Sequence, residues 1–157
     1  MDLKITAEEL LRRYIAGERN FSGVDLTGVK FRRCCDLPGI DLSNANLTEV
    51  ILMSADLSGA DLSGADLSNI KLDRTNLSGA DLSGADLTEA SLAESILEGA
   101  DLSFADLTRA NLIESSLVNA NLTGAIMEET LLGYPLIEGA DLTGVDLSKA
   151  IMDPPFF

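Results

Sequence analysis

The sequence predicts an all-β solenoid, in which short extended segments and turns repeat along the chain and stack into coils. Three observations support this fold class. An apolar residue recurs every five positions from Leu37 to Met152, which makes 24 repeats with Leu at the centre of 21. A compact residue, most often Ala, lies two positions earlier, and Asp or Asn usually stands between them. Aromatic residues are 4% of the chain and apolar residues 46%, so aliphatic and small side chains must build the core.

A period of five matches neither the 3.6 residues of a helix nor the two of a simple strand. If each repeat is an extended piece followed by a turn, the central residue and the residue two before it point the same way. Leu and Ala then point inward, Asp points outward, and the next two residues form the turn. Four such corners would close a square coil of about 20 residues whose backbone pairs with neighbouring coils. The periodicity alone also permits three-sided or irregular coils.

Several repeats carry a recognisable consensus. Residues 55–59, 60–64 and 80–84 read Ala-Asp-Leu-Ser-Gly, and residues 120–124 read Ala-Asn-Leu-Thr-Gly. These repeats resemble the pentapeptide-repeat family, and the resemblance covers residues 19–154. It implies a right-handed quadrilateral parallel β-helix that serves as a non-catalytic protein-interaction or scaffolding rod, and it does not indicate which biological role the rod has. Family members that protect DNA gyrase are thought to mimic DNA, so an acidic regulator of DNA gyrase or another DNA-binding enzyme is the alternative.

The chain divides into an N-terminal capping helix within residues 1–18, a β-helix over residues 19–154 and a tail over residues 155–157, all in one domain. Thr6 and Glu9 have the spacing of a capping box, and Gly17 suits the position after a helix end. We therefore expect a helix over residues 7–16. Its role would be to cover the open apolar mouth of the first coil, because uncovered ends of stacked repeats favour aggregation.

Two irregularities interrupt the repeat. The interval from Phe31 to Leu37 is six residues, so one residue is inserted within residues 32–34. We expect a bulged corner there, with Cys35 pointing inward and Cys34 near the surface. A disulfide between adjacent cysteines would be strained, so two reduced thiols are expected, with a reactive thiol at a partner site as the alternative.

The C-terminal end carries the second irregularity. Residues 153–157 read Asp-Pro-Pro-Phe-Phe, and proline should stop the coil. Phe156 and Phe157 then either fold over the last layer or contact another molecule. The second alternative would give a homodimer through the C-terminal end.

The charge of the chain is concentrated in the repeats. The net charge is −15; residues 1–33 have a balance of +2 and residues 34–157 a balance of −17. Such a charge repels nucleic acid and anionic lipid and favours a basic protein partner. Because stacked carboxylates repel one another, we expect raised pKa values and a higher melting temperature near pH 5 than near pH 8.

Aligning repeats at intervals of four gives two candidate surfaces. The candidate acidic interaction face comprises Asp41, Asp61, Asp81, Asp101, Asp141, Asp66, Asp86, Asp106 and Asp146. The candidate apolar interface comprises Ile126, Leu131, Leu136, Ile151, Phe156 and Phe157. A contiguous exposed apolar patch commonly marks an interface.

The sequence offers no catalytic, cofactor-binding or metal-binding residues. It contains no histidine, the usual acid or base near neutral pH, and its carboxylates would lie on a convex surface without a cleft. We therefore expect a protein that is not an enzyme and has no cofactor. The apolar stretches are too short for a membrane span, and the N-terminal residues do not resemble a signal peptide, so we expect a cytoplasmic protein without membrane contact.

Overall fold

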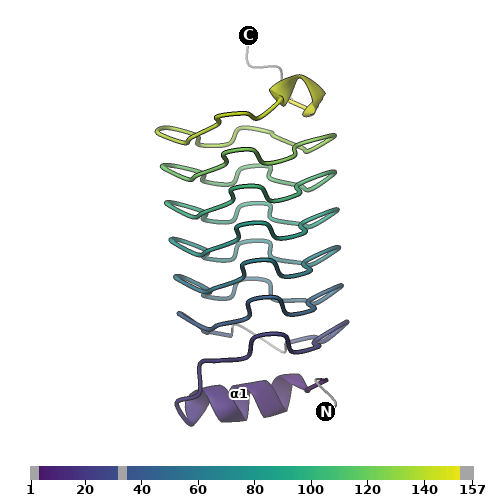
Figure 1. The fold of residues 1–157 in the computed structure, drawn as a ribbon, viewed down its shortest axis with the longest axis vertical. Coiled ribbons are helices and arrows are strands. Elements are labelled where there is room, and N and C mark those ends of the chain that lie inside the picture. The colour runs from purple at the N-terminus through teal and green to yellow at the C-terminus, as the bar shows by residue number, and fades with distance from the viewer. Residues whose placement is uncertain (1–3, 32–34, 153–157) are drawn as a thin grey trace.

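The backbone pairs each repeat with the repeat that lies 20 residues further along the chain. A computed structural model describes residues 4–31 and 35–152. Within it, parallel bridges join Asp41 to Asp61, Asp61 to Asp81 and Asp81 to Asp101. A turn follows the central residue of nearly every repeat. Four repeats and four turns therefore complete one coil, and the coils stack along one axis (Figure 1). The predicted parallel β-helix of five-residue repeats is confirmed.

Inward side chains and backbone hydrogen bonds hold the coils together. Leu62 and Ala60 are each 1% exposed. The Leu62 N–H donates to the carbonyl of Asp81 at 2.7 Å, and the Asp81 N–H donates to the carbonyl of Ala60 at 2.9 Å. Each coil therefore satisfies the buried polar groups of its neighbour, while Leu and Ala fill the interior.

The four sides of the coil are named here by the outward residue that precedes each central residue. The first side carries Asp41, Asp61, Asp81, Asp101, Asn121 and Asp141. The second side carries Asn46, Asp66, Asp86, Asp106, Ile126 and Asp146. The third side carries Ile51, Lys71, Ser91, Asn111, Leu131 and Ile151. The fourth side carries Asp36, Asp56, Asn76, Ile96, Ser116 and Leu136.

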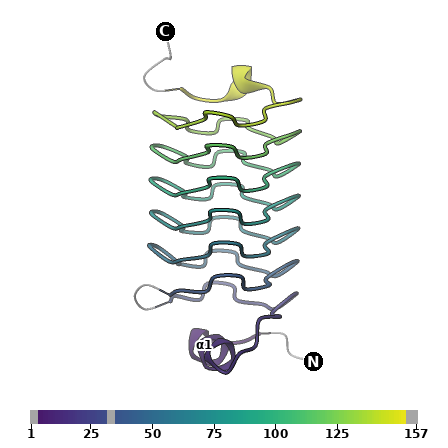
Figure 2. The ribbon, with the colours of Figure 1, turned by 90° about the vertical axis from the view of Figure 1, so that its left-hand side faces the viewer.

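Helix α1 (Ala7–Ile15) lies across the N-terminal end of the stack, roughly perpendicular to its axis (Figures 1 and 2). The Thr6 hydroxyl accepts a hydrogen bond from the Glu9 N–H at 3.1 Å, which satisfies a free donor of the first turn. Gly17 follows with a φ of 101°. The helix predicted for residues 7–16 is therefore present, and it ends one residue earlier. Leu10 is fully buried in the same core as Phe21.

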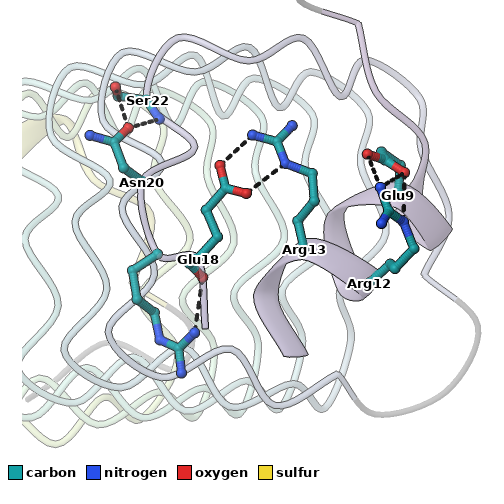
Figure 3. Close-up of polar contacts among 7 residues, drawn as sticks. Glu9, Arg12, Arg13, Glu18, Asn20 and Ser22 are labelled. Atoms are coloured by element: carbon teal, nitrogen blue, oxygen red, sulfur yellow. Dashed lines mark hydrogen bonds and ion pairs between the residues drawn. The ribbon is translucent and has the colours of Figure 1, made fainter. Parts of the chain in front are cut away.

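Polar contacts also tie α1 to the first coil. The Tyr14 hydroxyl donates to the carbonyl of Pro38 at 2.8 Å. Arg13 pairs with Glu18 (Figure 3) and its guanidinium lies 5.0 Å from the centre of the Phe21 ring. Exposed ion pairs contribute little stability on their own, so the buried Leu10 and these contacts together position the helix.

The bridge pattern locates the inserted residue. Lys30 pairs with Ile51, an interval of 21 residues, whereas Asp36 pairs with Asp56, an interval of 20. The predicted insertion between Phe31 and Leu37 is confirmed. Cys35 is 6% exposed and points inward as predicted. Cys34 and the bulged corner predicted at residues 32–34 lie outside the described residues.

The last coil departs from the regular pattern. A short 3-10 helix, η1 (Leu147–Lys149), replaces the turn on the second side. Within the described residues, Ile126 has no bridge to Asp146, although Leu131 pairs with Ile151 on the third side. The tail, with the predicted contacts of Phe156 and Phe157, lies outside the described residues.

Candidate interaction surfaces

The aspartates of the candidate acidic face share one local geometry. Oδ1 of Asp81 accepts a hydrogen bond from the Ser83 N–H at 2.9 Å, and Asp101 accepts from the Ser103 N–H at the same distance. This contact between a side chain and the backbone two residues later is an Asx turn. The other seven predicted aspartates make the same bond, namely Asp41, Asp61, Asp66, Asp86, Asp106, Asp141 and Asp146. The turn therefore fixes each carboxylate at the surface.

The turn requires a side-chain oxygen but not a negative charge. Asn76, Asn111 and Asn121 accept the equivalent backbone bond at 3.0 to 3.1 Å. The first and second sides nevertheless carry Asp at nine of their twelve turn positions, while the fourth side carries two and the third side none. The excess of charge on the first two sides is therefore not explained by turn formation.

The predicted increase in carboxylate pKa is wrong for the aspartates whose shift is resolved. Hydrogen bonds from the hydroxyl and N–H of Ser103 lower the pKa of Asp101 and outweigh the effect of burial. Burial raises the pKa of Asp66, but hydrogen bonds from Ser68 and Thr48 outweigh it and lower the pKa. Thr143 lowers the pKa of Asp141 in the same way. Donors in the turn stabilise the ionised carboxylate more than neighbouring carboxylates destabilise it.

The second side also carries basic residues at one corner. Arg109 lies 2.9 Å from Glu89, one coil below, and Lys149 lies 2.5 Å from Glu128. On the first side, the repeats from 40–44 to 140–144 contain no Lys or Arg. The first side is therefore the more uniformly acidic of the two.

One aromatic residue interrupts the first side. Phe104 is 70% exposed and has a φ of 57°, a left-handed conformation that is unfavourable for a bulky side chain. A Cβ atom added to Gly124 would lie 2.8 Å from the Phe104 ring, so the ring covers Gly124 of the next coil. Phe104 was not among the site residues predicted from the sequence. The signal was present, because Gly64, Gly84, Gly124 and Gly144 occupy the same position in other coils.

Comparison with known proteins identifies the repeat. The family profile for pentapeptide repeats (8 copies) matches residues 35–64, 85–124 and 95–132. The chain belongs to the pentapeptide repeat family. No protein among the curated sequences matches it.

Solved pentapeptide repeat structures are similar to this chain. One is a protein of the Arabidopsis thaliana thylakoid lumen, with 38% identity and a TM-score of 0.46; the match covers 59% of this chain and 61% of that one. HetL, a protein involved in heterocyst differentiation regulation from the cyanobacterium Nostoc, has 28% identity and a TM-score of 0.40, with 96% and 98% covered. QnrB1, a plasmid-mediated fluoroquinolone resistance protein, has 23% identity and a TM-score of 0.41, with 84% and 77% covered. This chain thus matches less than two thirds of the Arabidopsis protein.

The candidate apolar interface is spread around the pentapeptide repeat coil. Ile126, Leu136 and Ile151 are 47%, 62% and 46% exposed, while Leu131 is half-buried. Ile126 lies on the second side, Leu131 and Ile151 on the third and Leu136 on the fourth. The described members therefore occupy three sides and not one face. Phe156 and Phe157 lie outside the described residues.

Two further properties of the described chain bear on its chemistry. Over residues 4–31 and 35–152, the acidic and cysteine side chains form no group of three that could hold a metal ion. In the same part of the pentapeptide repeat chain, no helix combines the length and apolar character needed to cross a membrane.

Proposed function

We propose that this protein is a non-catalytic interaction rod whose first and second sides bind a basic surface of a partner protein. The observation that carries the proposal is the excess of carboxylates on these two sides. Nine aspartates lie at positions where Asn would satisfy the same turn, and the turn holds each of them in place. Pre-positioned charges steer a partner of opposite charge and specify its orientation.

Phe104 adds an apolar contact within the acidic surface. Its exposed ring lies on the same side as Asp101 and Asp81. Arg or Lys side chains bind over aromatic faces as well as to carboxylates. A partner that presents Arg to this surface would use both kinds of contact.

Asp to Asn substitutions test this proposal without changing the turn. Asp81→Asn with Asp101→Asn removes two charges from the first side, and Asp36→Asn with Asp56→Asn removes two from the fourth. The probe is an arginine-rich peptide, titrated by calorimetry at low and moderate salt. We expect the first-side pair to weaken binding several-fold more than the fourth-side pair. Equal losses would show that binding follows net charge alone and would contradict a specific surface.

Mimicry of DNA is a second candidate, favoured by the two neighbouring columns of carboxylates. Coils about 4.8 Å apart with two carboxylates each would give one charge per about 2.4 Å, against about 1.7 Å in duplex DNA. Asn121 and Ile126 interrupt both columns near the C-terminal end, which favours the more general basic partner. A supercoiling assay with purified DNA gyrase separates the two, because only a DNA mimic should inhibit or protect this enzyme.

The handedness of the coil and the location of the protein in the cell are also part of the proposal. A right-handed winding is supported by membership in the pentapeptide repeat family. The cytoplasmic location stays a prediction from the sequence.

A further inference from the structure

Apolar side chains gather where the third and fourth sides of the coil meet. Ile96 and Leu136 on the fourth side are 42% and 62% exposed, and Tyr134, at the corner between the two sides, is 63% exposed. Half-buried apolar residues lie beside them on both sides. The corner surface is defined by six residues of three successive coils: Ile96, Ile113, Val118, Leu131, Tyr134 and Leu136.

Hydrogen bonds between outward side chains show which residues are neighbours on these sides. The Ser116 hydroxyl donates to Oε1 of Glu98 at 3.0 Å, and the Ser91 hydroxyl donates to Asp73 on the third side. The outward residue of one repeat therefore lies beside the residue that follows the central residue one coil below. The same register forms two apolar pairs, Leu136 with Val118 and Leu131 with Ile113.

Carboxylates lie among these apolar residues. Glu94 and Glu114 occupy the corner position in successive coils, and both are exposed. The third-side and fourth-side repeats within residues 90–139 contain four glutamates and no Lys or Arg. Lys71 and Arg74 on the third side lie one coil earlier. The corner surface therefore combines apolar side chains with negative charge.

Tyr134 follows the two glutamates at the same corner position. Its φ of 52° is a left-handed conformation that is unfavourable for an aromatic side chain. The ring is exposed, so it does not repay this conformation by filling the core. An exposed aromatic face binds a cation such as the side chain of Arg or Lys. Tyr134 and the glutamates thus favour a partner of the same charge.

We propose that the corner surface docks an amphipathic, basic helix of a partner protein. The apolar residues of this helix pack against Ile96 and Leu136, and its Lys or Arg residues pair with Glu94 and Glu114. Three coils about 4.8 Å apart span about 10 Å from the first to the last, and two turns of an α-helix rise about 11 Å. Successive turns of the helix therefore meet successive coils. This surface is separate from the first and second sides and goes beyond their proposed role.

A second copy of the chain fits the corner surface less well. A two-fold contact would place the four glutamates of one copy against the same four of the other, and like charges oppose association. Helix α1 carries basic residues, but Arg12 pairs with Glu9 and Arg13 with Glu18 in the same chain. Leu10 on the apolar face of α1 is fully buried. The helix is therefore already packed against its own core.

Binding of a designed peptide, measured by calorimetry, tests the proposal. The probe is an amphipathic peptide of about 14 Leu and Lys residues, which forms about four helical turns. Its control has the same composition in an order without an apolar face. Ile96→Ser should weaken binding of the probe several-fold, and Ile96→Ser with Leu136→Ser should weaken it roughly tenfold or more, because apolar contacts are lost. Circular dichroism should stay unchanged, since both side chains are exposed.

Ile126→Ser is the matched control for Ile96→Ser. Ile126 is 47% exposed and lies on the second side, so its loss should change the affinity by less than about twofold.

A pair of glutamate variants tests the contribution of charge. Glu114→Gln removes a charge from the corner surface, and Glu49→Gln removes one from the corner that follows the second side. Both residues are exposed and have a φ of 58°, so the two changes are matched. Only Glu114→Gln should weaken binding of the probe, and its effect should decrease as salt is raised.

Equal losses within either matched pair, or equal binding of the two peptides, would overturn the proposal. Sedimentation that detects a dimer for the unmodified protein and a monomer for Ile96→Ser with Leu136→Ser would assign the surface to a second copy and would also overturn it. The arginine-rich peptide should bind these variants normally. Failure of the corner surface and failure of the first and second sides are therefore distinguishable.

Discussion

The first and third sides of the coil have the same interior and different exteriors. Leu82 on the first side and Leu92 on the third are both fully buried. Outside, the first side presents Asp81 with Ser83, and the third presents Ser91 with Ala93. The interior residues specify the coil, and the outward residues are free to differ between sides. Specificity for a partner must therefore lie in the outward residues.

The largest expected effect tests whether the inward residues of the first and third sides contribute equally to stability. Leu82→Ala and Leu92→Ala should each lower the free energy of unfolding by about 2–5 kcal/mol, because each leaves a cavity between close-packed coils. Urea denaturation followed by circular dichroism measures both. Ser83→Ala on the same repeat as Leu82 is the exposed control and should change stability far less. A large difference between the two leucine variants would show that the sides contribute unequally to the core.

A smaller effect tests the Asx turn, which the first side has and most repeats of the third side lack. Asp81→Ala should destabilise the protein by about 1 kcal/mol, because the Ser83 N–H loses its acceptor. Asp81→Asn should be close to neutral, since Asn121 accepts the same bond on this side. Thermal and urea unfolding of the two variants gives the difference. Equal destabilisation would mean that the charge, and not the Asx turn, stabilises this position.

The sequence predicted the regular parts of this fold because the repeat itself encodes them. The five-residue period gave the inward Leu and Ala positions, and the six-residue interval after Phe31 located the insertion with Cys35 inward. Thr6 and Gly17 marked the helix ends to within one residue. These features depend on local pattern and need no knowledge of distant contacts.

Other features could not be predicted, because they depend on contacts between particular side chains that the repeat pattern does not specify. Stacked aspartates in successive coils predicted repulsion between carboxylates, yet the Ser103 hydroxyl and N–H decide the pKa of Asp101. The five-residue period already places Ile126 and Leu136 two corners apart, as the structure has them, so grouping them in one interface was an error of interpretation and not a missing signal. The apolar pocket of about 330 Å³ that the central residues of the last two coils line was also missed, because it arises where the stack ends.

Phe104 permits a test in which stability and binding should change in opposite directions. Phe104→Gly removes a bulky residue from a left-handed conformation, which costs about 1–2 kcal/mol for residues other than Gly. Loss of the ring contact over Gly124 offsets part of this gain. We expect a net increase in stability of up to about 1 kcal/mol by urea denaturation. Binding of the arginine-rich peptide should weaken; unchanged binding would remove Phe104 from the proposed surface.

The smallest expected effect concerns pH. Hydrogen bonds hold the pKa of Asp66, Asp101 and Asp146 below the ordinary value of 3.8. A folded-state pKa below the unfolded value adds stability above the unfolded pKa, and this stability is lost as pH falls through the folded pKa. The melting temperature should therefore change little between about pH 8 and about pH 5 and decrease below about pH 4.

Thermal unfolding followed by circular dichroism across this range measures the pH effect. Asp66→Asn with Asp101→Asn should reduce the decrease below about pH 4, because Asn keeps the turn without a titrating group. The third side supplies the control: Lys71→Gln changes a charge at a position without an Asx carboxylate and should leave the acid transition unchanged. A melting temperature clearly higher near pH 5 than near pH 8 would show that repulsion between coils outweighs the donors within each turn.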